Sequence, residues 1–276
     1  MQIKYCCTYW GSEKDKPDVF VDKVLSAGYE GIEISLSSDE IFKAHLIQQI
    51  ENVRLRNDDF IFIAQQLTTP VNDTVEDYIC RMKMSLTELA AYQPSFINSH
   101  TGKDYYSFDD NCKVIEAALN ISSKTGIRIL HETHRGRFSF HAASLIPYLK
   151  KFPEMELVGD FSHFCTVSES MLQGQDEIIQ QIIPHVSHIH ARIGWEQGPQ
   201  VNDPIAPEWQ NHFLLFESWW QQIILHRKET GWENIAITPE FGPSPYMPLE
   251  PFTQKPLSNQ WDNNIYMMNK LKKVFS

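Results

Sequence analysis

Four side chains that could bind a metal ion lie just where a short apolar run of the sequence ends. They are Glu132, Asp160, His190 and Glu240, and they fall in the segments ILHETH, LVGD, SHIHAR and AITPEFG. Three carboxylates and one imidazole suit a single divalent ion, with Mn²⁺, Mg²⁺, Co²⁺ and Zn²⁺ all compatible. We therefore predict an active site built on one divalent metal ion. The alternative is an accidental rim of charges.

The elements that must position these residues recur along the chain as short apolar runs, each followed by an amphipathic stretch. The predicted strands are 3–10, 31–36, 60–67, 95–100, 127–133, 156–160, 186–193 and 234–240, and the predicted helices are 17–27, 40–56, 75–92, 109–124, 140–151, 176–183, 212–230 and 259–275. Eight such units in 276 residues match a (β/α)₈ barrel. A doubly wound sheet would need fewer strands or an added domain, and no GxGxxG follows a strand. The sequence predicts an α/β fold, with a single (β/α)₈ TIM barrel domain over residues 1–276.

The period of two in a strand supports this arrangement. On the seventh predicted strand, His190 and Arg192 share one face, while isoleucine and alanine occupy the other. The same alternation puts Glu132, Asp160 and Glu240 on the inner face of their strands. All four candidate ligands are therefore expected to point into the barrel.

Other polar side chains are expected on the inner face near strand ends. They are Glu33, Asn98, His100, His134 and either Gln65 or Gln66. Glu33 is either a salt-bridge partner inside the rim or a catalytic group. We interpret His188, deeper in its strand, as structural or as support for a ligand, and expect His131 to face the helices. Trp10, at the end of the first strand, either stacks on a sugar ring or is buried in the rim.

Two proline-rich connections, 194–211 and 241–257, follow the last two strands. Loops at this end of a barrel carry the active site, and loops of this length are usually functional, so we expect lids or walls. Their large apolar residues mark either a dimer interface or a substrate wall; they are Trp195, Trp209, Tyr246 and Met247. The Trp219–Trp220 pair, in a predicted helix, is most simply core packing.

The composition excludes several classes of protein. Acidic residues outnumber basic ones 35 to 24, and a net charge of −11 opposes broad binding to nucleic acid. The five cysteines are odd in number and form no CxxC pair, and Cys6 and Cys7 lie in an apolar run that favours buried thiols, which together indicate a reducing compartment. No apolar stretch approaches the roughly 18 residues of a membrane span. We expect a cytoplasmic protein that binds neither nucleic acid nor membrane.

Taken together, several segments resemble the xylose-isomerase-like TIM barrels. These are GYEGIE (28–33), the Glu132 strand end, DFSH (160–163), HIH (188–190) and EFG (240–242). That superfamily includes sugar isomerases, ketose 3-epimerases, inosose dehydratases and hydroxypyruvate isomerases, with endonuclease IV as a remoter member. In its ketose 3-epimerase branch one divalent ion is held by Glu, Asp, His and Glu. The resemblance places these ligands at Glu132, Asp160, His190 and Glu240.

The resemblance also implies a substrate-hydroxyl contact for His163, three residues after the aspartate. The branch has an arginine several residues after its histidine ligand. Here position six after His190 is Glu196, and the nearest arginine is Arg192. The segment His134–Arg137 adds positive charge that could receive an acidic or phosphorylated substrate, or it is a solvated turn. Our candidate substrate-binding residues are His163, Arg192, His100, Glu33, His134 and Trp10.

These residues suit proton transfer next to a carbonyl group. The ion would chelate a carbonyl and a neighbouring hydroxyl and lower the pKa of the adjacent C–H. Glu132 and Glu240, from non-adjacent strands, could then remove and return the proton through a metal-stabilised enediolate. The predicted function is that of a metal-dependent isomerase or epimerase of a sugar or sugar derivative, with a small carbohydrate as its substrate. The sequence is compatible with a homo-oligomer and does not specify the oligomeric state.

Four alternatives remain. An inosose-type dehydratase needs the same first step. An endonuclease IV-like phosphodiesterase would require several zinc ions, more histidine ligands and a basic groove. A metal-free glycosidase could use Glu132 and Glu240 as its carboxylate pair, but would leave Asp160 and His190 without a joint purpose. The last alternative is a non-catalytic sugar-binding barrel.

Overall fold

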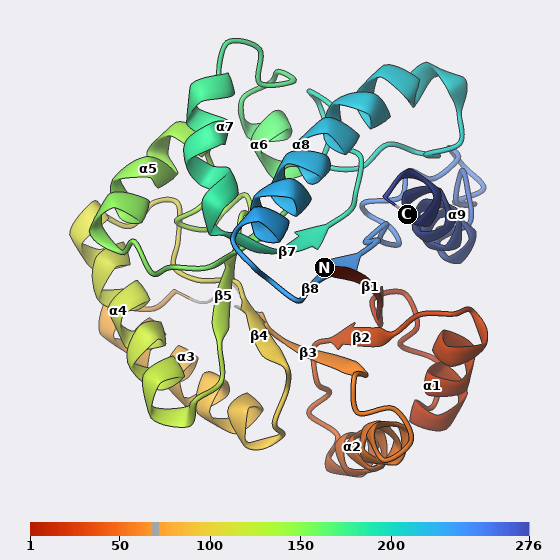
Figure 1. The fold of residues 1–276 in the computed structure, drawn as a ribbon, viewed down its shortest axis with the longest axis horizontal. Coiled ribbons are helices and arrows are strands. Elements are labelled where there is room, and N and C mark those ends of the chain that lie inside the picture. The colour runs from red at the N-terminus through yellow and green to blue at the C-terminus, as the bar shows by residue number, and fades with distance from the viewer. Residues whose placement is uncertain (68–71, 276) are drawn as a thin grey trace.

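The computed structural model of the chain describes residues 1–67 and 72–275. Within these residues, eight parallel strands close into one barrel in chain order, and β1 pairs with both β2 and β8. The strands are β1 (Gln2–Thr8), β2 (Gly31–Ile34), β3 (Ile61–Gln66), β4 (Phe96–Ser99), β5 (Ile129–Glu132), β6 (Leu157–Gly159), β7 (Val186–His190) and β8 (Asn234–Thr238). The predicted (β/α)₈ barrel is confirmed. The helices surround the ring of strands on its outside (Figure 1).

The helices follow the predicted order. They are α1 (Pro17–Ser26), α2 (Glu40–Arg54), α3 (Val75–Ala91), α4 (Phe108–Thr125), α5 (Ala142–Lys151), α6 (Ser162–Val167), α7 (Asp176–Ile182), α8 (Gln210–Glu229) and α9 (Gln260–Val274), with two 3₁₀ turns, η1 (Ile183–His185) and η2 (Pro207–Trp209). The side chains of Asp39, Thr74 and Ser107 cap α2, α3 and α4, because each accepts a hydrogen bond from a backbone N–H group in the first turn of its helix. Gly126 ends α4 in the left-handed conformation, with φ 72°.

The sequence prediction differs from the structure in two respects. It did not anticipate α6, because six residues are too short to show a helical period. It also made several strands too long. Since β6 ends at Gly159 and β8 at Thr238, Asp160 and Glu240 lie just beyond the paired parts of their strands.

The barrel has two apolar layers. The larger lies between strands and helices, and it contains the outward-facing Ile189 and Ile237 together with Trp219 and Trp220. The smaller fills the inside of the barrel and consists of Cys6, Ile63, Phe96, Leu130, Val158 and Ala236. Two residues beyond Leu130, Val158 and Ala236, the inner face becomes polar. The polar residues therefore lie on an apolar plug at the carboxyl ends of the strands, as the alternation predicted.

None of the helices in the described part of the chain is long and apolar enough to cross a membrane.

Candidate metal centre

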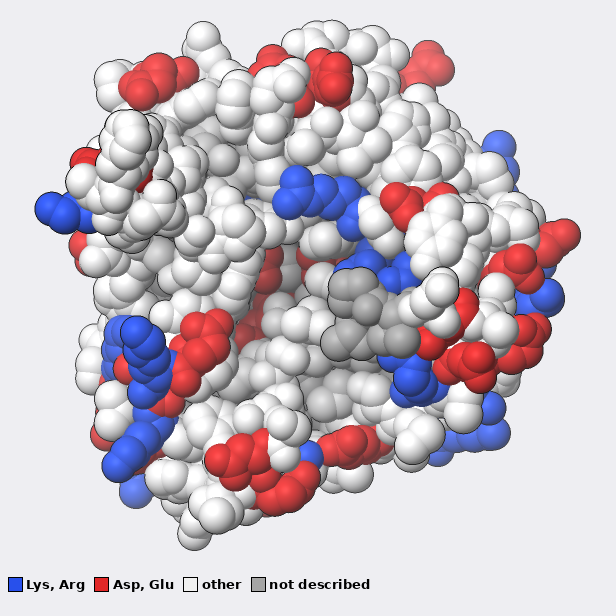
Figure 2. Space-filling model, turned by 180° about the vertical axis from the view of Figure 1, so that it is seen from behind, with Lys and Arg blue, Asp and Glu red and all other residues white. Residues whose placement is uncertain are grey.

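A cavity of about 520 Å³ opens at the carboxyl ends of the strands. Figure 2 shows this face hollowed near its middle, with acidic side chains in the depth of the hollow and basic side chains above it and on one side. The polar side chains that line the cavity are mainly Gln65, His100, Glu132, His134, Arg192 and Glu240. Apolar and aromatic side chains line the side towards β1 and β2, namely Tyr9, Trp10, Leu36, Phe42 and Tyr246. The cavity therefore joins a polar floor to an apolar wall.

The four predicted ligands converge beneath this cavity. One ligand atom from each of Glu132, Asp160, His190 and Glu240 lies within 4.8 Å of the others, and all four residues are buried. Nδ1 of His190 lies 2.9 Å from Oε2 of Glu240 and 3.7 Å from Oε1 of Glu132. Such a concentration of buried carboxylates is costly unless positive charge compensates it.

The imidazole of His190 is oriented as a metal ligand would be. Its Nε2 lies 2.9 Å from Oε1 of Glu33, to which it can donate its N–H, so Nδ1 is left to face the carboxylates. Among the described residues, this buried Nδ1 has no hydrogen-bond partner, because its contact with Glu240 is close but badly angled. A carboxylate behind a histidine is the usual support for a metal-bound imidazole. The four side chains therefore fit a divalent ion.

Glu33 lies behind the cluster and does not line the cavity. Its carboxylate accepts hydrogen bonds from Asn98 at 2.9 Å and Thr238 at 2.7 Å, and it also contacts His188 at 3.0 Å. Burial alone would raise the pKa of Glu33, but His190 and His188 hold that pKa well below its usual range. Glu33 thus forms a buried salt bridge with the histidines of β7.

Glu132 is held by two neighbours on β4 and the loop that follows it. Asn98 donates to its Oε2 at 2.7 Å, and Nε2 of His100 lies 3.1 Å from the same oxygen. Nδ1 of His100 lies 3.2 Å from Nη2 of Arg137, which can only donate, so the imidazole proton must sit on Nε2 and point at Glu132. Burial raises the pKa of Glu132, but His100 and His190 outweigh this and keep its pKa well below the usual range.

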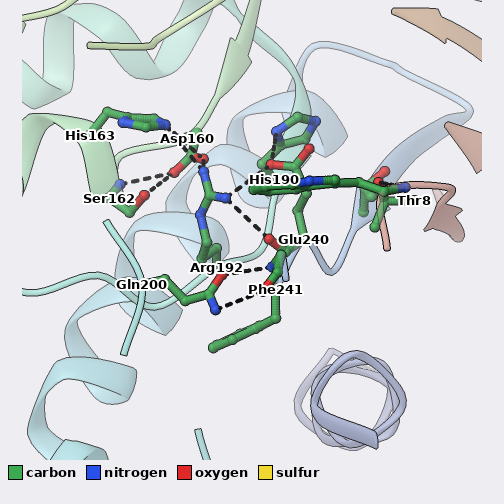
Figure 3. A network of polar contacts seen from close by, with 12 residues as sticks. Thr8, Asp160, Ser162, His163, His190, Arg192, Gln200, Glu240 and Phe241 are labelled. Atoms are coloured by element: carbon green, nitrogen blue, oxygen red, sulfur yellow. Dashed lines mark hydrogen bonds and ion pairs between the residues drawn. The ribbon is translucent and has the colours of Figure 1, made fainter. Parts of the chain in front are cut away.

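Asp160 is bound by a residue of its own turn and by an arginine that follows β7. Its Oδ1 accepts from both the backbone N–H and the hydroxyl of Ser162, the first residue of α6. Its Oδ2 accepts from Nη2 of Arg192, which lies between Asp160 and Glu240 in Figure 3. Burial raises the pKa of Asp160, and Arg192 offsets only part of this effect.

Three imidazoles lie in a row along one side of the site, with their rings tilted against one another. The ring of His134 lies 4.5 Å from that of His100 and 3.9 Å from that of His163. Nε2 of His163 lies 3.2 Å from Nη2 of Arg192, so it accepts a hydrogen bond. Burial, with further positive charge nearby, lowers the pKa of both His134 and His163 well below the usual value. These two histidines are therefore neutral and serve as hydrogen-bonding groups.

The candidate substrate-binding residues occupy two levels. Trp10, His100, His134 and Arg192 line the cavity. Glu33 and His163 are fully buried beneath it and are absent from its lining. Glu196 lies apart from the cluster, 3.4 Å from His212.

The structure also shows which way the remaining polar side chains face. Gln65, not Gln66, faces inward, where its amide lies 3.1 Å from Glu33. His131 faces the helices as expected, in contact with Thr101 and with the ring of Phe138.

The sequence did not single out the apolar wall of the cavity. Tyr9 and Leu36 fall in the predicted strands 3–10 and 31–36, and Phe42 falls in the predicted helix 40–56. All three line the cavity, where Phe42 lies 5.7 Å from the ring of Tyr9. Nothing in the local pattern separates an apolar side chain that lines a cavity from one that packs in a core.

The two long loops contribute differently to the site. The loop after β8 supplies Tyr246, whose ring is 4.9 Å from that of Trp10. The loop after β7 supports it, since Gln200 exchanges two hydrogen bonds with Gly242. Met247 is buried, and Trp195 packs against a second tryptophan of its own loop. Arg135, in the basic segment after β5, lies over the ring of Tyr246 at 5.1 Å.

No protein-family model matches this sequence, and no curated protein matches it. Solved structures match along nearly the whole chain. The probable 3-DHS dehydratase AsbF from Bacillus anthracis has 15% identity and a TM-score of 0.63, with 98% of both chains covered. The 3-keto-D-glucoside 4-epimerase YcjR from E. coli has 13% identity and a TM-score of 0.62, with 99% of this chain and 100% of that chain covered.

A third match is a xylose isomerase-like TIM barrel protein from Mycobacterium smegmatis in complex with magnesium. It has 12% identity and a TM-score of 0.59, with 99% of this chain and 98% of that chain covered. At these identities the likeness establishes the fold. The chain has the fold of the xylose isomerase-like TIM barrels.

Proposed function

We propose that this protein is a metal-dependent enzyme that moves a proton next to the carbonyl group of a sugar or sugar derivative, as an isomerase or epimerase. The observation that carries the proposal is the placement of two glutamates in one cavity. Glu132 ends β5 and Glu240 lies just beyond β8, and both line the cavity and lie close to His190.

The two glutamates are suited to removing and returning a proton. Oε2 of Glu132 is held by Asn98 and His100, and Oε1 of Glu240 lies 3.5 Å from the amide of Gln65. These contacts fix the direction of each carboxylate, which a group that exchanges a proton with carbon requires. Since the glutamates come from strands that are not neighbours, they can approach a substrate carbon from two sides.

A divalent ion held by the four clustered side chains would polarise a carbonyl and offset the negative charge that develops when a proton leaves the neighbouring carbon. The residues around the ion would bind and orient the substrate. His134 offers a hydrogen-bond acceptor to a substrate hydroxyl, because its Nδ1 lies 2.6 Å from the carbonyl oxygen of Arg135 and must carry the proton.

The aromatic wall supports a carbohydrate as the substrate. Trp10, Tyr9 and Tyr246 present rings to the cavity a short way above the polar floor. The C–H face of a sugar ring packs well on such rings while its hydroxyls reach polar groups.

A dehydratase of a β-hydroxy ketone is the second candidate. Dehydration begins with the same removal of a proton. The structural match to AsbF, a probable 3-DHS dehydratase, supports dehydration as the second candidate activity. The two activities differ in whether a hydroxyl group leaves the neighbouring carbon.

The test combines metal analysis with proton exchange. The purified protein is assayed for bound divalent metal, and the metal-loaded protein is incubated in D₂O with a panel of ketoses and keto-glycosides. We expect deuterium to enter a carbon next to the carbonyl of at least one compound, with a changed configuration, a shifted carbonyl or loss of water. A protein that binds no divalent ion would contradict the proposal.

A further inference from the structure

Arg192 lies in the middle of the candidate metal centre and touches two of its four ligands. It follows β7, and its side chain is 1% exposed. Nη2 donates to Oδ2 of Asp160, while Nη1 donates to the backbone oxygen of Glu240 at 3.2 Å and lies 3.5 Å from its Oε2 (Figure 3). Arg192 therefore already supplies positive charge to the carboxylates that would bind an ion.

Both oxygens of Asp160 have hydrogen-bond donors within the protein. The donors to Oδ1 belong to Ser162, two residues along the same turn, so their position is part of the local backbone geometry. The donor to Oδ2 comes from a long side chain 32 residues away, whose position is not tied to the local backbone of Asp160. Of the two partners, Arg192 is the one that can leave.

Two like charges at this separation repel strongly. A guanidinium within hydrogen-bond reach of Asp160 and 3.5 Å from a carboxylate oxygen of Glu240 lies only a few ångströms from any ion that those oxygens could share. The site is buried, so water screens the repulsion poorly.

The side chain of Arg192 also has an alternative position, on the aromatic side of the cavity. Its guanidinium carbon lies 4.8 Å from the ring centre of Tyr246 and 6.0 Å from that of Trp10, and all three residues line the cavity. Its buried Nε has no hydrogen-bond partner among the described residues. The guanidinium could therefore turn along these rings towards the cavity and retain a favourable contact with their faces.

We propose that Arg192 competes with the divalent ion for Oδ2 of Asp160 and thereby sets the metal affinity of the site. When the ion takes this oxygen, the guanidinium turns towards Trp10 and Tyr246 and becomes a hydrogen-bond donor to the substrate. The inference rests on the proposed function in one respect, since it takes the four clustered residues to be a metal site.

The test is a calorimetric titration of the metal-stripped full chain with Mn²⁺. Arg192→Met keeps most of the side-chain length and removes the charge, so it should bind Mn²⁺ roughly tenfold more tightly than the wild type, or better. Arg192→Lys keeps the charge but cannot make both contacts, so its gain should be smaller. Arg135→Met is the matched control, because it removes a charge over the same tyrosine without touching the cluster, and its affinity should equal that of the wild type.

Each other outcome has a definite meaning. If Arg192→Met binds Mn²⁺ with equal or lower affinity than the wild type, Arg192 supports Asp160 instead of competing for it, and only this inference is wrong. If neither protein binds Mn²⁺, or any other divalent ion, the metal site is wrong and the proposed function fails with it. Should Arg192→Met not fold, Arg192→Lys decides, and an affinity no higher than the wild-type value overturns the inference.

Discussion

Oε1 of Glu33 lies 2.9 Å from Nε2 of His190, across the inside of the barrel from β2 to β7. This contact determines which nitrogen of His190 faces Glu132, Asp160 and Glu240. Because Nε2 is directed at Glu33, Nδ1 is the atom left for a metal ion. Glu33 thus positions a ligand without itself reaching the cavity.

The first prediction concerns this supporting carboxylate. Glu33→Gln should lower the metal affinity about 10- to 100-fold, the usual effect of losing a group that orients a metal-bound histidine. Calorimetric titration of the metal-stripped protein measures it. Glu30→Gln is the control, because Glu30 directly precedes β2 and pairs with Lys4 away from the cluster. Equal affinities for Glu33→Gln and the wild type would contradict the role of Glu33.

The second prediction concerns the proton-transfer pair. Glu132→Gln and Glu240→Gln should each reduce turnover by about 100- to 10,000-fold, because an amide cannot accept the proton. Exchange of carbon-bound hydrogen in D₂O is the direct measurement, with circular dichroism to show that the fold persists. Near-full activity of either variant on a true substrate would rule out the two-glutamate scheme.

The third prediction concerns pH. Burial lowers the pKa of His190, but Glu240 and Glu33 outweigh it and hold that pKa well above the usual value. The metal-free protein therefore carries a proton on His190 at neutral pH, and a metal ion must displace it. Metal affinity should rise from pH 6 to pH 8, with a proton released on binding that calorimetry in buffers of different ionisation enthalpy detects. An affinity that does not change with pH would be inconsistent with this.

The same shift has a consequence for stability. Since the folded-state pKa of His190 is raised, its contribution to the free energy of unfolding of the metal-free protein is fully present below the unfolded value of about 6.5. It is lost as the pH rises through the folded-state pKa. Thermal unfolding of the metal-free protein should show a corresponding loss on the alkaline side, and His190→Gln should remove that part of the pH dependence.

The fourth prediction is that chelation stops the reaction. Treatment with EDTA should abolish proton exchange, and one or more of Mn²⁺, Mg²⁺, Co²⁺ and Zn²⁺ should restore it. Hydrolysis of nitrophenyl glycosides that survives EDTA would instead favour the metal-free glycosidase, in which Glu132 and Glu240 alone carry the chemistry.

The fifth prediction concerns the aromatic wall. A Cβ added at Gly242 would lie 2.2 Å from the ring of Trp10, so Gly242→Ala must displace this tryptophan. We expect KM for the true substrate to rise several-fold with a smaller change in kcat, together with a loss of stability of about 1–3 kcal/mol. Trp10→Ala should raise KM in the same way without the steric strain. An unchanged KM in both variants would show that the substrate does not use this wall.

The sequence by itself determined the succession of strands and helices and the face on which each polar residue lies. Both depend on local periods, because a strand alternates between its two faces whatever lies beside it. Glu132, Asp160 and Glu240 are in register with Leu130, Val158 and Ala236, which lie inside the barrel. His190 lies on the face opposite Ile189 and Ala191, which pack towards the helices.

Only the tertiary structure decided which of these residues meet. Glu33 and His190 are 157 positions apart, and they come into contact because closing the barrel brings β2 opposite β7. The partners of Arg192 follow from strand pairing, since β7 lies between β6 and β8 and the guanidinium reaches an aspartate beyond β6 and a glutamate beyond β8. A local pattern specifies the direction in which a side chain points, and the distance between two side chains is set by the closed ring of strands.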